Sequence, residues 1–203
     1  MRNVVRGAIA LVVVVAAYWA WALAGAAELA SAASRGDAAA VIERVDIAAL
    51  SRSLSGQISR AYLEQNPELQ KLLEAKGIKG GIAINAAAAE MLLRAFLTPE
   101  NIAAILNRGS AGLPADAGGL QMPSFGEAFR GGGLIETVAH SHFDGPASFV
   151  VGLNSPDGRY GVHMNLAGTT WRLSGVDIPD TVTARLARQI AERVGGLMDR
   201  PGG

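Results

Sequence analysis

An uncharged apolar run covers residues 7–27 of the chain and includes four consecutive valines at residues 12–15. The hydrocarbon core of a bilayer takes about 20 apolar residues of α-helix, so the run is long enough to span a membrane. Arg2 and Arg6 precede it, and no acidic residue lies before residue 28. By the positive-inside rule, we expect the N-terminal end in the cytoplasm and the rest of the chain on the outer side.

A cleaved secretory signal peptide is the alternative interpretation of this run. Small residues allow cleavage near Ala24 or Ala26, which would release a secreted protein. The run is longer than the roughly 7–15 apolar residues of a typical signal peptide. Tyr18, Trp19 and Trp21 also gather at its outer end, where an aromatic belt lies at a membrane interface. We therefore favour a retained anchor, with these three side chains at the interface.

The organisation that follows is a membrane anchor, or signal peptide, at residues 1–27 and an exported domain at residues 28–203. This places the anchor in the inner membrane and the domain in the periplasm or outside the cell. Arg2 and Arg6 account for two of the 18 basic residues, so the domain keeps 16 against 18 acidic residues. A slightly acidic domain argues against nucleic-acid binding. The absence of cysteine excludes disulfides, thiolate metal sites and a cysteine nucleophile.

Helical patterns dominate the first half of the exported part. The alanine-rich residues 22–33 lack a strong helix breaker, so the first helix is expected to continue into the domain. Asp37, Asp46 and Thr98 each precede a helical pattern as N-cap residues. A further alanine-rich helix is expected at residues 82–97.

Residues 109–133 contain eight glycines and two prolines, the composition of a loop. Ser124 and Glu127 have the spacing of a capping box, which predicts one turn of helix carrying Phe125 and Phe129. This glycine-rich loop separates the helical half of the chain from a half with a different period.

After the loop, apolar and polar residues alternate as in strands. Residues 149–153 and 160–166 alternate around the turn at residues 155–158, and residues 171–174 alternate again. With residues 134–143 as a first strand, we expect an antiparallel meander of about four strands. A C-terminal amphipathic helix is predicted after Pro179. The predicted fold class is therefore α+β.

Several short motifs, in their order and spacing, carry a family resemblance from about residue 17 to 180. They are Trp19-Ala20-Trp21-Ala22-Leu23, Gly36-Asp37, Val45-Asp46-Ile47 with Leu50, Ser53-Leu54, Leu97-Thr98-Pro99-Glu100, Trp171-Arg172-Leu173 and Ile178-Pro179. In these features the chain resembles the bacterial family called Domain of Unknown Function 2939. The resemblance implies a short protein with an apolar N-terminus and an envelope location. It implies no catalytic residue.

His140 and His142 are the candidate metal ligands, because strand residues two apart point to the same side. His163 is expected to point outward, since Tyr160, Val162 and Met164 form the inward face of its strand. No acidic residue has a defined helical spacing to the histidine pair. Surface histidines are therefore the favoured interpretation, and no metal or other cofactor is assigned.

Large aromatic side chains are the other candidates for a site. Trp171, Tyr160 and Phe149 lie on the inward face of the predicted strands, where they either fill the core or line a pocket. We expect a non-enzymatic, membrane-anchored envelope protein that binds the bilayer through its first helix and a protein partner or apolar small molecule through its domain. The alternatives are a metal-dependent envelope enzyme using the histidine pair and a structural tether without ligand.

Overall fold

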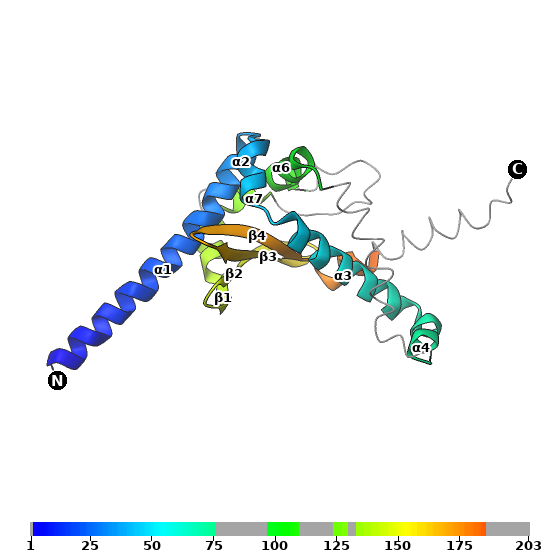
Figure 1. Cartoon of the computed structure of the whole chain (residues 1–203), viewed down its shortest axis with the longest axis horizontal. Helices are drawn as coiled ribbons and strands as arrows, with labels where there is room; N and C mark the ends of the chain where they lie inside the picture. The colour runs from blue at the N-terminus through cyan, green and yellow to red at the C-terminus, as the bar shows by residue number, and fades with distance from the viewer. Residues whose placement is uncertain (1, 76–96, 110–123, 130–132, 186–203) are drawn as a thin grey trace, which may run out of the picture.

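The computed structural model describes residues 2–75, 97–109, 124–129 and 133–185, which form a set of helices and one sheet (Figure 1). The elements are α1 (Arg2–Ser34), α2 (Ala38–Glu43), α3 (Ile47–Gln65), α4 (Pro67–Ala75), α6 (Pro99–Arg108), α7 (Phe125–Ala128), α8 (Gly133–Ala139), β1 (His142–Gly145), β2 (Ser148–Ser155), β3 (Gly158–Ala167) and β4 (Thr170–Asp177). A last helix begins at Asp180. The predicted α+β class is confirmed.

Three helices begin at the residues that the sequence predicts as N-caps. The side chain of Asp37 accepts a hydrogen bond from the Ala40 N–H at the start of α2, and Asp46 does the same for Ala49 in α3. Thr98 caps α6, in which proline occupies the first turn. These caps satisfy N–H groups that have no partner within the helix. The chain therefore turns sharply between short helices without leaving these donors unpaired.

The four strands form one antiparallel sheet in the order β1-β2-β3-β4, as the predicted meander requires. The hairpin between β2 and β3 keeps its register from the Phe149–Met164 pair to the turn at residues 155–158. A register shift interrupts the pairing of β3 with β4 after His163. The alternation of buried and less buried residues along β3 leaves one face of the sheet for the core.

The first strand differs from its prediction at residues 134–143. Residues 133–139 form α8, and β1 begins only at His142. Among the side chains that the structure describes in α8, Thr137 is buried, and its hydroxyl donates to the Ala128 carbonyl at 3.0 Å. Ser141, just after the helix, is also buried, and its hydroxyl donates to the Thr137 carbonyl at 2.6 Å. Ile135 stays 79% exposed. The pattern of apolar residues predicted a strand here because the buried positions, Thr137 and Ser141, carry hydroxyl groups instead of apolar side chains.

Helix α3 covers the edge of the sheet at β4. The side-chain amide of Gln57 donates to the Val176 carbonyl at 2.6 Å and accepts from the Ile178 N–H at 3.0 Å. At the other end of β4, Val45 forms an isolated parallel bridge with Leu173. An uncovered edge strand offers its backbone to other chains, so these contacts protect β4 from edge-to-edge pairing.

The core lies between the inward face of the sheet, the C-terminal half of α1 and the short helices α2, α6 and α7. Its largest fully buried side chains are Trp171, Tyr160, Phe125 and Phe149. Phe125 lies on the predicted helical turn and packs against Phe129, with ring centroids 5.2 Å apart. The turn at α7 thus joins the glycine-rich stretch to the core.

Some predicted features fall outside the described residues. These are the helix at residues 82–97 except for its last position, most of the loop at residues 109–133, and the final helix beyond residue 185.

Candidate functional site

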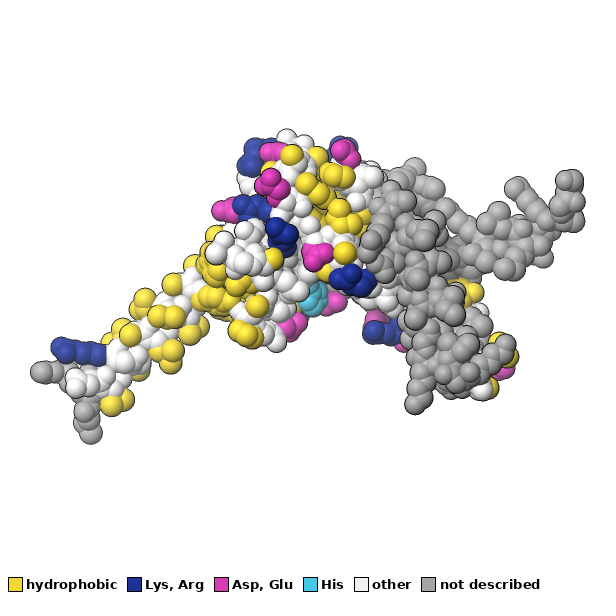
Figure 2. Space-filling view, in the orientation of Figure 1, with side chains coloured by type: hydrophobic (Ala, Val, Ile, Leu, Met, Phe, Trp, Pro, Cys, Tyr) yellow, Lys and Arg dark blue, Asp and Glu magenta, His cyan; other side chains and the backbone are white. Residues whose placement is uncertain are grey.

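Helix α1 is one continuous helix with two very different halves (Figure 2). Residues 3–17 are all exposed, with Val4, Val12 and Val15 at 75%, 66% and 53%. In the second half, Ala22, Ala26 and Leu29 are completely buried. The first half therefore projects from the domain as an apolar rod, whereas the second half is part of the core.

By length and composition, α1 is able to cross a membrane. Among the described residues it is the one helix long and apolar enough to do so. Only 6% of its most apolar 18-residue window is buried. A long core helix of a soluble protein has the same composition but is mostly buried. An exposed apolar helix of this length fits either a membrane anchor or a signal sequence.

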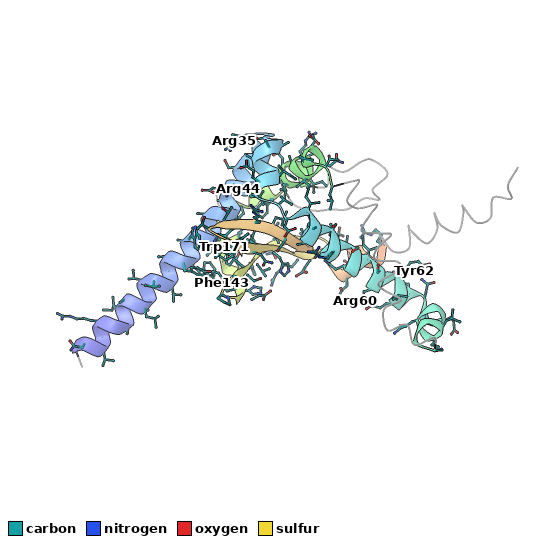
Figure 3. The ribbon with its side chains drawn as sticks, viewed as in Figure 1. Arg35, Arg44, Arg60, Tyr62, Phe143 and Trp171 are labelled. Atoms are coloured by element: carbon teal, nitrogen blue, oxygen red, sulfur yellow. The ribbon has the colours of Figure 1, made fainter. Side chains whose placement is uncertain are left out.

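Aromatic side chains gather where α1 leaves the domain (Figure 3). Tyr18 stacks on Phe143 of β1 with ring centroids 5.2 Å apart, and its hydroxyl donates to the carbonyl of Pro146. Trp19 meets Phe149 edge to face at 5.4 Å. The structure therefore places Tyr18 and Trp19 partly against β1 and β2. We call this group, together with Trp21 and Trp171, the aromatic junction.

Trp21 and Trp171 complete the aromatic junction on its β4 side. Their ring centroids lie 5.8 Å apart, but Trp171 is 1% exposed and Trp21 is 39% exposed. Trp171 fits because Gly25 lacks a side chain: a Cβ on Gly25 would lie 2.7 Å from the Trp171 Cβ. The indole N–H of Trp171 is buried and finds no hydrogen-bond partner in the described part of the chain. Of the junction residues, Trp21 thus presents the most surface to the surroundings of the helix.

Tyr160 lies on the same sheet face as Trp171 but near the opposite end of β3. It is 1% exposed, and its hydroxyl has no hydrogen-bond partner among the residues that the structure describes. Burial raises the pKa of Tyr160, and the nearby Asp157 carboxylate adds to the rise, while the Arg185 guanidinium partly offsets it. Asp157 itself pairs with Arg185 at 3.3 Å. Tyr160, Phe149 and Trp171, predicted as core or pocket-lining residues, are all buried on the inward face.

The histidines do not form the predicted strand pair. His140 lies in the turn after α8, and its Nδ1 is 2.8 Å from the Glu136 carbonyl oxygen. His142 is on β1, 3.3 Å from Asp144. The argument from strand alternation fails because the chain becomes extended only at His142. Within the described ranges, no group of three histidine, aspartate or glutamate side chains is arranged to hold a metal ion.

A different histidine cluster crosses the outward face of the sheet. His163 lies between Asp177, with Nε2 to Oδ2 at 2.6 Å, and Asp144, with Nδ1 to Oδ2 at 3.9 Å. The predicted outward direction of His163 agrees with this position. Sequence reasoning missed the cluster because it placed Asp144 beyond the end of the first strand. These contacts connect β1, β3 and β4 across the surface.

In comparisons with known proteins, similarity is found in the N-terminal half of the chain. No curated protein and no solved structure matches the sequence. A family model matches residues 11–105, which contain the tryptophan motif of α1 and the capping motifs of α2, α3 and α6, whereas the Trp171 and Pro179 motifs lie outside the match. The chain thus resembles, over residues 11–105, the family described as Protein of unknown function (DUF2939).

Proposed function

We propose that this protein is an uncleaved, membrane-tethered envelope protein whose exported α+β domain acts as a non-enzymatic binding or interaction module. The observation that carries the proposal is the division of α1 into an exposed apolar half and a buried half. Water solvates an exposed helix surface of valine, isoleucine and leucine poorly, whereas a bilayer accommodates it. Arg2 and Arg6 at the N-terminal end favour a cytoplasmic N-terminus.

The packing of α1 supports retention of the helix over cleavage. Cleavage near Ala24 or Ala26 would remove Tyr18, Trp19 and Trp21 from contact with the sheet. It would also cut next to Gly25, whose backbone lies against Trp171. Cleavage would uncover Phe149 and Trp171, which are 0% and 1% exposed, and each fully buried large apolar side chain contributes about 1.5–3 kcal/mol, so the loss approaches the stability of a small domain. The proposed mature protein therefore keeps the whole helix.

The polar groups on the sheet surface support an interaction module. His163 is enclosed by the carboxylates of Asp144 and Asp177, and Arg185 is paired with Asp157. These side chains bind one another, which fixes the outer surface of the strands. The partner of this module is proposed to be a protein or an apolar small molecule on the outer side of the membrane.

Membrane fractionation tests the tether. The full chain is expected to stay in the membrane pellet after an alkaline carbonate wash. The double variant Val12→Asp/Val14→Asp should move to the soluble fraction, because two carboxylates in the hydrocarbon core oppose insertion. Both residues are more than half exposed and lie outside the core cluster of the described residues, so the domain should still fold. Ala39→Asp, at an exposed position of α2, is the matched control and should stay in the pellet. Release of the unmodified chain by the wash would contradict the proposal.

A further inference from the structure

We infer that the domain is seated on the bilayer through two uncharged turns at the end of the sheet, an inference that rests on the proposed membrane tether. The turns are residues 145–148, between β1 and β2, and residues 167–170, between β3 and β4. We call them the junction turns. The partner proposed for them is the headgroup region of the membrane into which α1 inserts.

The length of the free part of α1 requires this seat. Residues 3–17 are exposed along the whole helix surface. At 1.5 Å per residue these 15 residues extend about 22 Å, which is shorter than the hydrocarbon core of about 30 Å. Arg6 falls at the inner end of this length, where its long side chain extends to the cytoplasmic headgroups. The missing length corresponds to about five further residues of helix. The membrane must therefore reach the level of Tyr18 to Ala22, where α1 already touches the sheet.

Direct contacts place the junction turns at that level. The Tyr18 hydroxyl donates to the Pro146 carbonyl in the first turn. The Leu166 N–H donates to the Ala147 carbonyl at 2.9 Å, which holds the second turn beside the first. Trp171, directly after the second turn, packs against Trp21 of α1. Since α1 continues unbroken through this region, insertion of its first half brings both turns to the membrane surface.

The chemistry of the junction turns suits the headgroup boundary. Neither turn contains a charged residue, and Pro146, Ala147, Ala167, Gly168 and Thr169 are exposed. Figure 2 shows hydrophobic side chains continuing from the projecting helix onto the adjoining end of the domain. Tyrosine and tryptophan are the side chains that membrane interfaces favour. The composition therefore permits contact with lipid without burying an unpaired charge.

The first ion pair on α1 marks the outer limit of the seat. Glu28 pairs with Arg44 at 2.6 Å, and the Glu28 side chain is 59% exposed. Glu28 follows Trp21 by seven residues, about 10 Å along the helix. Headgroup regions add roughly 5–8 Å on each side of the hydrocarbon core. The ion pair consequently reaches the aqueous side when Trp21 lies at the interface, so the domain has one depth at which all these groups fit.

Single-cysteine fluorescence in vesicles tests the seat, because the chain has no native cysteine. The full-length variants Ala147→Cys, Thr169→Cys, Leu11→Cys and Ala39→Cys are labelled with NBD and reconstituted in phosphatidylethanolamine–phosphatidylglycerol vesicles. Lipids with a nitroxide at the headgroup or at acyl carbon 12 report depth. The labels at positions 147 and 169 should shift their emission to the blue and lose signal to the headgroup nitroxide. The label at position 11 should respond to the acyl nitroxide, and that at position 39 to neither.

Each other result overturns the inference in a distinguishable way. If the label at position 11 is quenched but those at positions 147 and 169 behave as at position 39, the seat is wrong and the anchor stands. If the labels on the turns are shielded from water without lipid quenching, a second copy of the chain covers the turns. If the label at position 11 also escapes both nitroxides, the proposed tether itself fails.

Discussion

The two halves of α1 have the same backbone and opposite surroundings. The first half exposes large β-branched and leucine side chains around its whole circumference, whereas the second presents alanine and glycine to the sheet. Small residues let the helix axis approach the strands, as the contact of Gly25 with Trp171 illustrates. Bulky apolar residues, in contrast, provide surface for lipid chains. Side-chain size rather than hydrophobicity alone thus separates the packed half from the free half.

Deletion of the two halves should have the largest effect. A chain without residues 2–14 is expected to keep a cooperative thermal transition and to lose membrane association. A chain without residues 2–27 also loses the contacts of Tyr18, Ala22 and Gly25. We expect its free energy of unfolding to fall by about 5 kcal/mol or more, which would abolish the cooperative thermal transition of a domain of ordinary stability. Circular dichroism melts in one detergent check this, and equal melting of both deletions would refute the division of α1.

Truncation of the tryptophans sharpens the same comparison across the aromatic junction. Trp171→Ala removes a fully buried side chain and should cost about 3–5 kcal/mol in the free energy of unfolding. Trp21→Ala should cost clearly less, because Trp21 remains 39% exposed in the absence of lipid. Urea unfolding followed by circular dichroism measures both. Similar losses for the two variants would show that Trp21 belongs to the core.

Two glycines of α1 form a matched pair. Gly7 lies in the half of α1 outside the core, and a Cβ there would meet nothing within 4 Å among the described residues, so Gly7→Ala should leave the melting temperature of the domain nearly unchanged. Gly25→Ala puts a methyl group 2.7 Å from the Trp171 Cβ, and such overpacking costs about 1–3 kcal/mol. The second variant should therefore be net destabilised. A higher melting temperature for Gly25→Ala would contradict the close contact.

The smallest effect is expected at the end of the sheet away from α1. The pKa of Tyr160 is raised above its ordinary value of 10.0 by burial and then by Asp157. Above about pH 10 the unfolded tyrosine ionises while the folded one keeps its proton, so stability should fall as pH rises. Tyr160→Phe should remove this pH dependence at little cost in stability, since the hydroxyl bonds to none of the described residues. Urea unfolding at several pH values between 8 and 11 measures the free energy of unfolding of both proteins. If this free energy falls with pH as steeply in the variant as in the parent chain, the explanation is wrong.

Local signals in the sequence were sufficient for much of the fold. Asp37, Asp46 and Thr98 indicate helix starts because a cap depends on neighbouring residues only. The hairpin of β2 and β3 follows from alternation and its turn. Helix α8 was missed because its buried residue Thr137, like Ser141 just after the helix, is polar and bonds to a nearby carbonyl. A prediction from the spacing of apolar residues does not detect a helix whose buried positions are polar.

The candidate site was only partly accessible to sequence reasoning. Tyr18, Trp19 and Trp21 stand out as aromatic residues at the end of an apolar run, but nothing local indicates that Phe143 and Trp171 meet them. Those contacts join residues more than 120 positions apart and depend on how the sheet packs on α1. The same limit applies to His163, whose carboxylate partners come from two other strands.

The central claim is that the mature protein retains α1 as both anchor and core element. The intact mass of the protein, extracted from the membrane fraction of cells that express the full chain, tests it most directly. We predict a mass that includes Tyr18, Trp19 and Trp21, in a species that is found with the membrane. A mature N-terminus within residues 25–28, on a protein recovered in the soluble fraction, would contradict the account.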